Sequence, residues 1–195
     1  QPYRFSNFDK KKDLRFQNYK NIFKDYSNFF YHQLFEESNK EALDYLLNRK
    51  LNKNIIKEFK LGYVPWKNNF YEELLKKYTE EDINLTGLYY KNDNSPETEF
   101  YKKGNMIFNL DKAKNSRVET DEVVIVEGYM DVVSVYSSGI KNVIANSGTA
   151  LTERQINLIW KFFANPIVCL DGDESGQKAA LRIAEKLFPL INEKN

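Results

Sequence analysis

Two stretches of this 195-residue chain decide its fold: Val123-Val-Ile-Val-Glu-Gly-Tyr-Met-Asp131 and Ile167-Val-Cys-Leu-Asp-Gly-Asp173. Each begins with four apolar residues, and such a run is typical of a strand that is buried on both faces of a sheet. Each run then ends directly in acidic residues and a glycine. Twice, therefore, a buried strand leads straight into carboxylates.

Strands and helices alternate through the rest of this part of the chain. We expect a helix over about 130–138 and a second short strand over 142–145. Thr152 and Gln155 have the spacing of a capping box that opens another helix, and a last helix is expected over about 175–187. Strand–helix units of this length predict an α/β fold with a parallel sheet and right-handed crossovers.

The first 93 residues, in contrast, are predicted to be mainly helical. Candidate N-caps are Ser38, which forms a capping box with Glu41, and also Asn52 and Thr79. One aromatic-rich stretch has helical spacing, which favours a buried core over a base-stacking surface. Its members are Phe16, Tyr19, Ile22, Phe23, Tyr26, Phe29 and Phe30. Residues 88–120 have no regular pattern, and residues 117–121 are expected to form a connector.

Composition excludes several classes of protein. Apolar residues make up 42% of the chain, enough for a core, and 29 basic against 28 acidic residues give no global electrostatic argument for nucleic acid. One histidine and one cysteine exclude a disulfide framework, a Cys-rich zinc module and a His–His metal site. The cysteine, Cys169, lies in an apolar strand and is expected to be an inert core thiol. No apolar run is long enough to span a membrane. The start at Gln1 suggests a fragment of a larger soluble, cytoplasmic protein.

Charge is distributed unevenly, because residues 121–195 carry 7 basic and 10 acidic side chains. In a parallel sheet all strands end at the same edge, and ligands bind outside these carboxyl ends. The sequence therefore predicts that Glu127, Asp171 and Asp173 lie together, although they are far apart in the chain.

Three clustered carboxylates repel one another unless a hard cation lies between them. Ligation by oxygen alone suits Mg²⁺ or Mn²⁺, with water and phosphate oxygens completing the shell. Gly128 and Gly172 are expected to permit a close backbone approach or unusual dihedrals. The alternative is that these acidic residues are ordinary turn residues and helix caps. Asp-Gly-Asp alone favours a turn, whereas both acidic motifs together favour metal-dependent phosphate chemistry.

The acidic motifs and their neighbouring strands resemble those of a known family. Residues 123–173 resemble a TOPRIM domain, the metal-binding module of primases, topoisomerases and some nucleases. More closely, the chain is similar to bacterial replicative DNA primases of the DnaG type over nearly its whole length. The similar stretches are Glu127-Gly-Tyr-Met-Asp131, Ala145-Asn-Ser-Gly-Thr-Ala150, Asp171-Gly-Asp-Glu-Ser-Gly176, Tyr45-Leu-Leu-Asn-Arg-Lys-Leu51, Phe59-Lys-Leu-Gly-Tyr-Val-Pro65, Asn94-Ser-Pro-Glu-Thr98 and Phe100-Tyr-Lys-Lys-Gly104. The resemblance implies a helical subdomain over 1–93, a basic nucleotide-side linker over 94–120 and a Rossmann-like TOPRIM unit over 121–195.

The resemblance also implies an activity, the synthesis of short RNA primers on single-stranded DNA from ribonucleoside triphosphates. Glu127, Asp171 and Asp173 would hold the catalytic Mg²⁺ or Mn²⁺, and Asp131 matches an acidic position that supports metal binding or catalysis. Lys103 and Asn94 match positions on the nucleotide and template side. Without the resemblance, Lys103 would be a solvated surface charge and Asn94 a turn residue.

The chain departs from the family pattern in three ways. The zinc-binding domain that normally precedes the core is absent, so zinc is not expected here. A family segment with an arginine-rich motif is missing before Asn94. The sequence stops before the last acidic motif and the part that binds the replicative helicase, so that partner would act through a region outside this sequence. The core itself is expected to be monomeric.

Two other classes of function remain open. The chain could be part of another TOPRIM enzyme, a nuclease or a topoisomerase, although none of its 13 tyrosines stands out as a nucleophile. It could also be a non-catalytic fragment that binds nucleic acid. The motifs upstream of the acidic constellation favour the primase.

Overall fold

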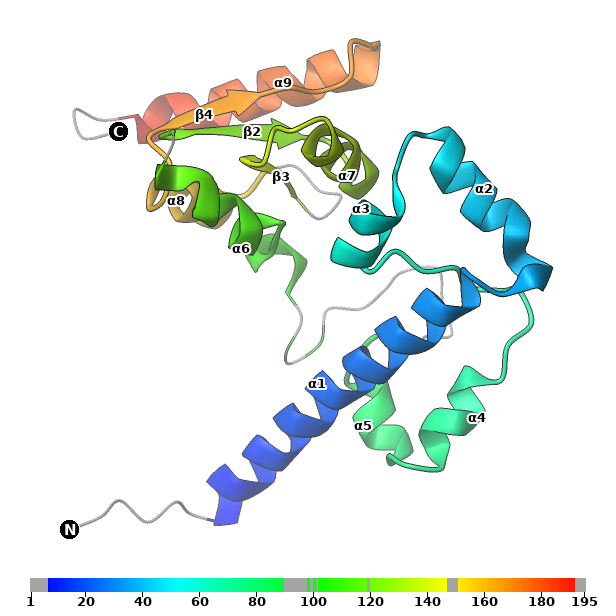
Figure 1. The fold of residues 1–195 in the computed structure, drawn as a ribbon. Coiled ribbons are helices and arrows are strands. Elements are labelled where there is room, and N and C mark those ends of the chain that lie inside the picture. The colour runs from blue at the N-terminus through cyan, green and yellow to red at the C-terminus, as the bar shows by residue number, and fades with distance from the viewer. Residues whose placement is uncertain are drawn as a thin grey trace. The chain divides into compact units, whose positions relative to one another are not determined.

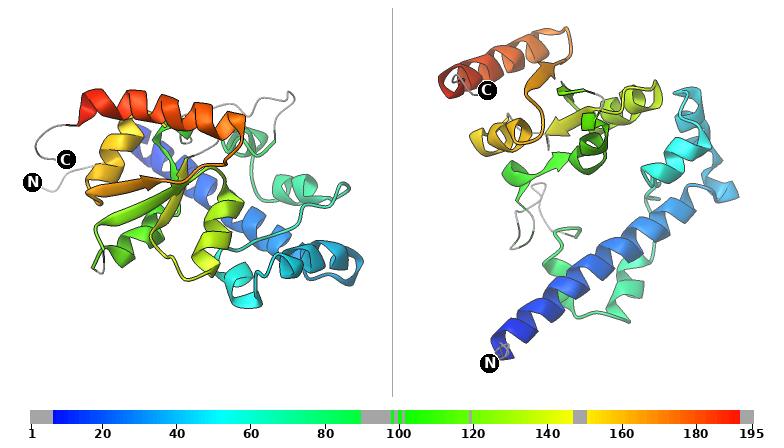
Figure 2. Two further views of the ribbon diagram at one scale, coloured as in Figure 1. Left: turned by 90° about the horizontal axis from the view of Figure 1, so that it is seen from above. Right: turned by 60° about the vertical axis from the view of Figure 1, so that its left-hand side comes forward.

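The computed structural model describes residues 7–89, 98, 100, 102–118, 120–146 and 151–191. The chain divides into two compact units, residues 1–102 and residues 103–195 (Figures 1 and 2). In the described part of the chain, no helix combines the length and the apolar character needed to cross a lipid bilayer.

The first unit is helical, as the sequence predicts. Its helices are α1 (Asn7–Gln33), α2 (Lys40–Asn48), α3 (Lys53–Glu58), α4 (Phe70–Leu75) and α5 (Glu80–Asn84), with a 3₁₀ turn over Glu37–Asn39. The helices α4 and α5 pack against α1 (Figure 1). The core of this unit joins Ile22 and Phe30 of α1 to Phe70 and Leu74 of α4 and to Ile83 of α5. The aromatic stripe is thus mainly core: the rings of Phe29 and Phe30 contact that of Phe70 at 4.6 and 5.4 Å between centroids.

Two of the three expected helix caps in this unit are confirmed. The side chain of Asn52 accepts hydrogen bonds from the backbone of α3, and that of Thr79 accepts one from Asp82 N at 3.2 Å. The capping box at Ser38 is wrong, because residues 37–39 form a 3₁₀ turn and α2 follows it. Asn39 Nδ2 instead donates to Gln33 O at 2.8 Å, which ties the turn back to the end of α1.

The second unit is built on a four-stranded sheet. Its strands are β1 (Ile107–Phe108), β2 (Glu122–Val126), β3 (Val143–Asn146) and β4 (Asn165–Val168), in the order β1-β3-β2-β4. The strand β2 pairs in parallel with both β3 and β4, as predicted, and β1 pairs antiparallel with β3. The sequence does not predict β1, which is too short to give a pattern. Residues 103–118 therefore fold with this unit.

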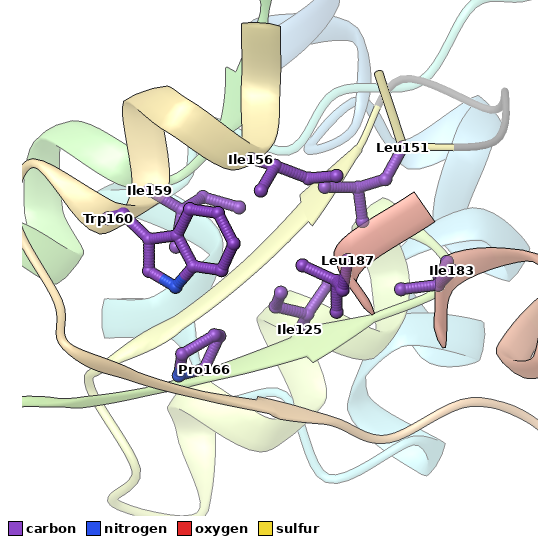
Figure 3. Close-up of a pocket in the computed structure, with 8 residues that line it drawn as sticks. All are labelled: Ile125, Leu151, Ile156, Ile159, Trp160, Pro166, Ile183 and Leu187. Atoms are coloured by element: carbon purple, nitrogen blue, oxygen red, sulfur yellow. The ribbon is translucent and has the colours of Figure 1, made fainter. Parts of the chain in front are cut away.

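Helices cover both faces of the sheet. They are α6 (Leu110–Ala113), α7 (Tyr129–Ser137), α8 (Glu153–Trp160) and α9 (Glu174–Leu187), joined by 3₁₀ turns over Lys103–Asn105, Lys114–Val118 and Phe188–Leu190. The helices α8 and α9 lie on one side of the sheet and α7 on the other (Figure 2). Figure 3 shows Ile156 of α8 and Leu187 of α9 pointing toward Ile125 of β2. The cavity between them, about 10 Å³, has an almost wholly apolar lining and is part of the core, not a ligand site.

The prediction for Cys169 is wrong, because its side chain is exposed. Within the described sheet, β4 is an edge strand that pairs with β2 alone. Side chains alternate along a strand, so Pro166 and Val168 face the α8–α9 side while Ile167 and Cys169 point the other way. Ile167 is 45% exposed, which shows that the described residues leave this side of β4 open to solvent.

The predicted capping box of α8 is confirmed and also has a second role. Gln155 Oε1 accepts from Thr152 N at 2.9 Å, and Thr152 Oγ1 accepts from Gln155 N at 3.2 Å. Gln155 is fully buried, and its Nε2 donates to Met106 O at 2.7 Å. Thr152 Oγ1 also donates to Gly104 O at 2.9 Å. The start of α8 therefore fixes the turn over residues 103–106.

Replacing Gln155 with leucine tests this anchor. The Gln155→Leu change keeps the volume but leaves the Met106 carbonyl and the Thr152 amide without their Gln155 partners, so we expect a loss of about 2–3 kcal/mol in the free energy of unfolding. Urea denaturation measures it, and Asn157→Ala on the exposed side of α8 is the control, with an expected change within about 0.5 kcal/mol. Equal losses in the two variants would contradict the anchoring role.

The buried hydroxyl of Tyr89 in the first unit is expected to make the free energy of unfolding depend on pH under alkaline conditions. Its ring packs on that of Tyr71 at 4.9 Å between centroids, and its buried hydroxyl has no hydrogen-bond partner among the described residues. Burial is the main cause that raises the pKa of Tyr89 to about 12, and the electrostatic effect of the neighbouring Tyr26 is the second. Because the folded-state pKa lies above the ordinary value near 10, the neutral phenol favours folding below pH 10, and this contribution is lost as the pH rises toward 12.

The test compares the wild-type protein with Tyr89→Phe in urea between pH 9 and pH 12. Above pH 10 the wild type is expected to lose up to about 1.4 kcal/mol per pH unit relative to the variant. At neutral pH the variant should be at least as stable, since it loses an unpaired hydroxyl. Parallel pH profiles would show that Tyr89 is not the group responsible.

Candidate active site

The two acidic segments leave the sheet at the same edge. Glu127 directly follows β2, and Asp171 follows β4 by three residues. The strands are parallel neighbours, with Ile125 opposite Val168, and Cys169 N donates to Ile125 O at 2.8 Å. Continued by two residues, this register places Glu127 opposite Leu170, one position before Asp171. Both acidic side chains are exposed.

The carboxylates themselves are not gathered into a cage. Among the described residues, no group of three or more His, Cys, Asp or Glu side chains is arranged to hold a metal ion. The backbones of the two segments are neighbours through the register of β2 with β4, and both carboxylates are exposed along this edge.

Two of the predicted site residues are helix caps in this structure. Asp173 is the N-cap of α9, and its Oδ1 accepts from Gly176 N at 2.7 Å. Asp131 lies in the first turn of α7, and its Oδ2 accepts from Gly128 N at 2.9 Å. The alternative interpretation of these acidic residues as caps therefore holds for both. A cap uses one carboxylate oxygen, which leaves the other oxygen of each residue for a ligand.

The two glycines beside the acidic residues differ in the space that a side chain would have at each position. A Cβ on Gly128 would lie 2.9 Å from Asp131 Oδ2, so a glycine permits the close approach of this capping carboxylate, as predicted. A Cβ on Gly172 would meet nothing within 4 Å, and Gly172 is not among the residues with positive φ. The expectation that Gly172 serves a close approach or an unusual dihedral is therefore wrong.

The other predicted site residues are only partly described. Asn94 lies outside the described residues, as do the junction before it and residues 147–150 of the predicted motif that begins at Ala145. Lys103 is described as backbone alone, in the turn that Thr152 and Gln155 anchor.

The donors at this edge fit a hard divalent cation. The candidate ligands are exposed carboxylate oxygens, and no histidine lies in this unit. Mg²⁺ prefers oxygen ligands and is commonly bound by one or two carboxylates, with water and substrate phosphates completing its shell. An edge without a three-carboxylate cage is therefore compatible with an ion that a nucleotide helps to hold.

The most exposed aromatic side chain among the described residues of the first unit is one that the sequence pattern does not predict. Trp66 is 95% exposed and stands in the loop between α3 and α4. Asn68 closes this loop, because its Nδ2 donates to Pro65 O at 3.0 Å and its Oδ1 accepts from Phe70 N at 3.2 Å. The loop has no hydrophobic periodicity, so the available signal was a tryptophan between a proline and a lysine.

Two family models match the chain, one for each unit. The model of the N-terminal domain of the DNA primase catalytic core matches residues 29–94, and that of the Toprim domain matches residues 121–193.

Curated relatives of the chain are DNA primases. That of Rickettsia bellii is 30% identical in a match that covers 78% of this chain and 32% of the relative. That of Staphylococcus aureus is 30% identical in a match that covers 82% of this chain and 34% of the relative. The chain thus spans about a third of the length of these relatives.

Solved structures with this fold are catalytic cores of primases, as the sequence resemblance implies. The E. coli primase catalytic core has a TM-score of 0.77 at 25% identity, covering 91% of this chain and 69% of that chain. A primase domain from Pseudomonas aeruginosa has a TM-score of 0.78 at 25% identity, covering 91% and 68%. A DnaG primase catalytic domain bound to single-stranded DNA shares the fold with a TM-score of 0.82 at 24% identity, covering 94% and 70%. With both domain models in order along the sequence, and with these relatives and this fold, the chain belongs to the family of bacterial DnaG-type DNA primases.

Proposed function

We propose that this chain is part of a primase catalytic core, which makes short RNA primers on single-stranded DNA by metal-dependent nucleotidyl transfer. The observation that carries the proposal is the edge where the acidic segments after β2 and β4 emerge side by side, in a chain that has both primase domains. Ligands of parallel sheets bind at such an edge.

Each acidic residue has a distinct role in this proposal. Glu127 and Asp171 bind the cation from adjacent strands, and the second oxygen of Asp173 adds a ligand from the cap of α9. Asp131 supports the site by fixing the Gly128 turn directly after Glu127. When bound, Mg²⁺ or Mn²⁺ neutralises the charge that develops on the phosphates during transfer.

Lys103 and Asn94 are the proposed nucleotide and template contacts. A lysine ammonium is a compact charge suited to a triphosphate. The anchoring of the turn that carries Lys103 supports this role, because a fixed turn lowers the entropic cost of binding. The ribonucleoside triphosphates would thus be held by a cation and by a lysine at once.

The remaining partners follow from the family. Single-stranded DNA is the proposed template, and a replicative helicase is the proposed partner through a part of the relatives outside this sequence. We place the activity at the replication fork in the cytoplasm, with the core as a monomer.

Trp66 is a proposed contact for the unpaired template. Bases of single-stranded nucleic acid stack on exposed aromatic rings next to positive charge, and the exposed indole is followed directly by Lys67. The Asn68 bonds hold the loop, so little order has to be gained on binding.

A second candidate function is binding without catalysis. The observation in its favour is the lack of a three-carboxylate cluster among the described residues. The same assay separates this function from primer synthesis.

The Asp171→Asn variant tests the catalytic role. It should lower Mg²⁺-dependent incorporation of ribonucleotides on a single-stranded template by at least about 100-fold, because a metal ligand contributes several kcal/mol to transition-state stabilisation. Circular dichroism should be unchanged. The control is Asp111→Asn, which removes an exposed carboxylate of α6 and should stay within about twofold of wild type.

The product identifies the class of enzyme. RNA made on the template supports the primase, strand scission supports a nuclease or topoisomerase, and retention of DNA without a product supports the binding fragment. Activity of Asp171→Asn close to that of wild type would refute the assigned role of Asp171.

The Trp66→Ala variant tests the template contact. Stacking of one base contributes about 1–3 kcal/mol, so the variant should bind a labelled oligo(dT) about 5- to 150-fold more weakly in fluorescence anisotropy. Trp66→Phe should retain most of the affinity, and Val64→Ala, at a neighbour that is 52% exposed, is the control. A loss no larger than that of the control would remove Trp66 from the template surface.

A further inference from the structure

The loop that carries Asp171 and Asp173 rests directly on the first turn of α9. Residues 171–175 are exposed, whereas the next residue, Gly176, is buried. Three hydrogen bonds join the turn to the loop: Gly176 N donates to Asp173 Oδ1 at 2.7 Å, Gln177 N donates to Asp173 O at 3.0 Å, and Gln177 Nε2 donates to Gly172 O at 3.1 Å. The acidic loop is therefore attached to a helix as well as to β4.

Gly176 brings the helix into direct contact with the loop backbone. A Cβ at this position would lie 2.0 Å from Asp171 O and 2.8 Å from Asp171 C. No real side-chain carbon fits there, so any other residue would push the Asp171 backbone away from α9. The absence of a side chain at residue 176 thus sets the place of Asp171.

The side chain of Gln177 restrains Gly172, the residue of the acidic loop with the greatest backbone freedom. Gly172 lies between the two aspartates, has no side chain, and has open space where a Cβ would be. A glycine loses more conformational freedom on ordering than any other residue. The bond from the Gln177 amide to the Gly172 carbonyl is the only side-chain hydrogen bond to Gly172 within the described structure.

We propose that Gly176 and Gln177 are positioning residues, which hold the Asp171–Asp173 loop in its ligand-bearing conformation before a divalent cation binds. The inference rests on the proposed function, since it assigns these residues to the same metal site. Two carboxylates separated by a glycine repel each other and move apart when the backbone is free. A loop that is already ordered avoids the entropic cost of ordering it on binding.

Gln177 suits this role chemically because its amide is a neutral donor. It fixes the loop without placing a positive charge beside the carboxylates, where the charge would compete with the cation. A merely structural role in capping α9 would change the stability of the helix and leave metal affinity unaltered. Metal affinity and loop order are therefore the measurements that separate the two roles.

The test uses Gln177→Ala in the full 195-residue chain. Mn²⁺ binding, followed by the electron paramagnetic resonance signal of the free ion, is expected to weaken about three- to tenfold, the range that one net hydrogen bond contributes. Hydrogen exchange of the amides of residues 172–176, measured without metal, should accelerate severalfold. Ser175→Ala is the matched control, because it removes a polar group of the same turn whose hydroxyl makes no hydrogen bond in the described structure.

A glycine variant gives an independent comparison. Gly176→Ala should weaken Mn²⁺ binding more than Gln177→Ala does, because its Cβ would displace the Asp171 backbone. Gln177→Ala is the deciding variant if Gly176→Ala fails to fold.

Weaker Mn²⁺ binding and faster exchange in Gln177→Ala, with Ser175→Ala unchanged, support the proposal. Unchanged exchange overturns it whether or not the site binds metal, because the loop is then ordered without Gln177. Faster exchange with unchanged Mn²⁺ affinity also overturns it and leaves the metal site standing. Wild-type protein that binds no Mn²⁺ overturns the proposed metal site and, with it, the positioning role.

Discussion

The parallel pairing of β2 with β4 brings the two acidic segments of the second unit to one edge of its sheet. Parallel neighbours end at the same edge, so the residues after Val126 and after Val168 meet although a strand and two helices lie between them in the chain. The register pairs Ile125 with Val168, and Val123 and Ile125 are buried in the core of this unit. The core thus sets the positions of the acidic segments.

Capping and metal binding are compatible uses of the same aspartates. Asp131 and Asp173 each use one oxygen to satisfy a backbone amide at the start of a helix. The free oxygens then lie next to helix N-termini, whose dipoles stabilise the ionised carboxylates. An aspartate that is fixed in this way presents its remaining oxygen in a defined place, which a ligand for a cation requires.

Local chemistry made much of this fold predictable from the sequence. The buried runs after 122 predicted the parallel strands, and the caps at Asn52, Thr79 and Thr152 are confirmed because a side chain and a backbone amide two or three residues later decide them. The wrong predictions depend on distant parts of the chain. The predicted cap at Ser38 does not form, and Asn39 of the same turn is hydrogen-bonded to the end of α1 instead. The exposure of Cys169 follows from the position of β4 at the edge of the sheet.

The candidate site was predictable as a set of residues but not as a set of contacts. Glu127 and Asp171 follow from the motifs, whereas the register that makes their segments neighbours depends on the direct pairing of β2 with β4. Gln177 has no motif of its own, and only the fold shows its bond to Gly172.

A crystal grown with Mn²⁺ and a ribonucleoside triphosphate would locate the ion by its anomalous scattering and show whether the two acidic segments share it. We expect a peak at about 2.0–2.3 Å from carboxylate oxygens of both Glu127 and the Asp171–Asp173 loop, with phosphate oxygens completing the shell. A peak bound by one segment alone, or by neither, would contradict it.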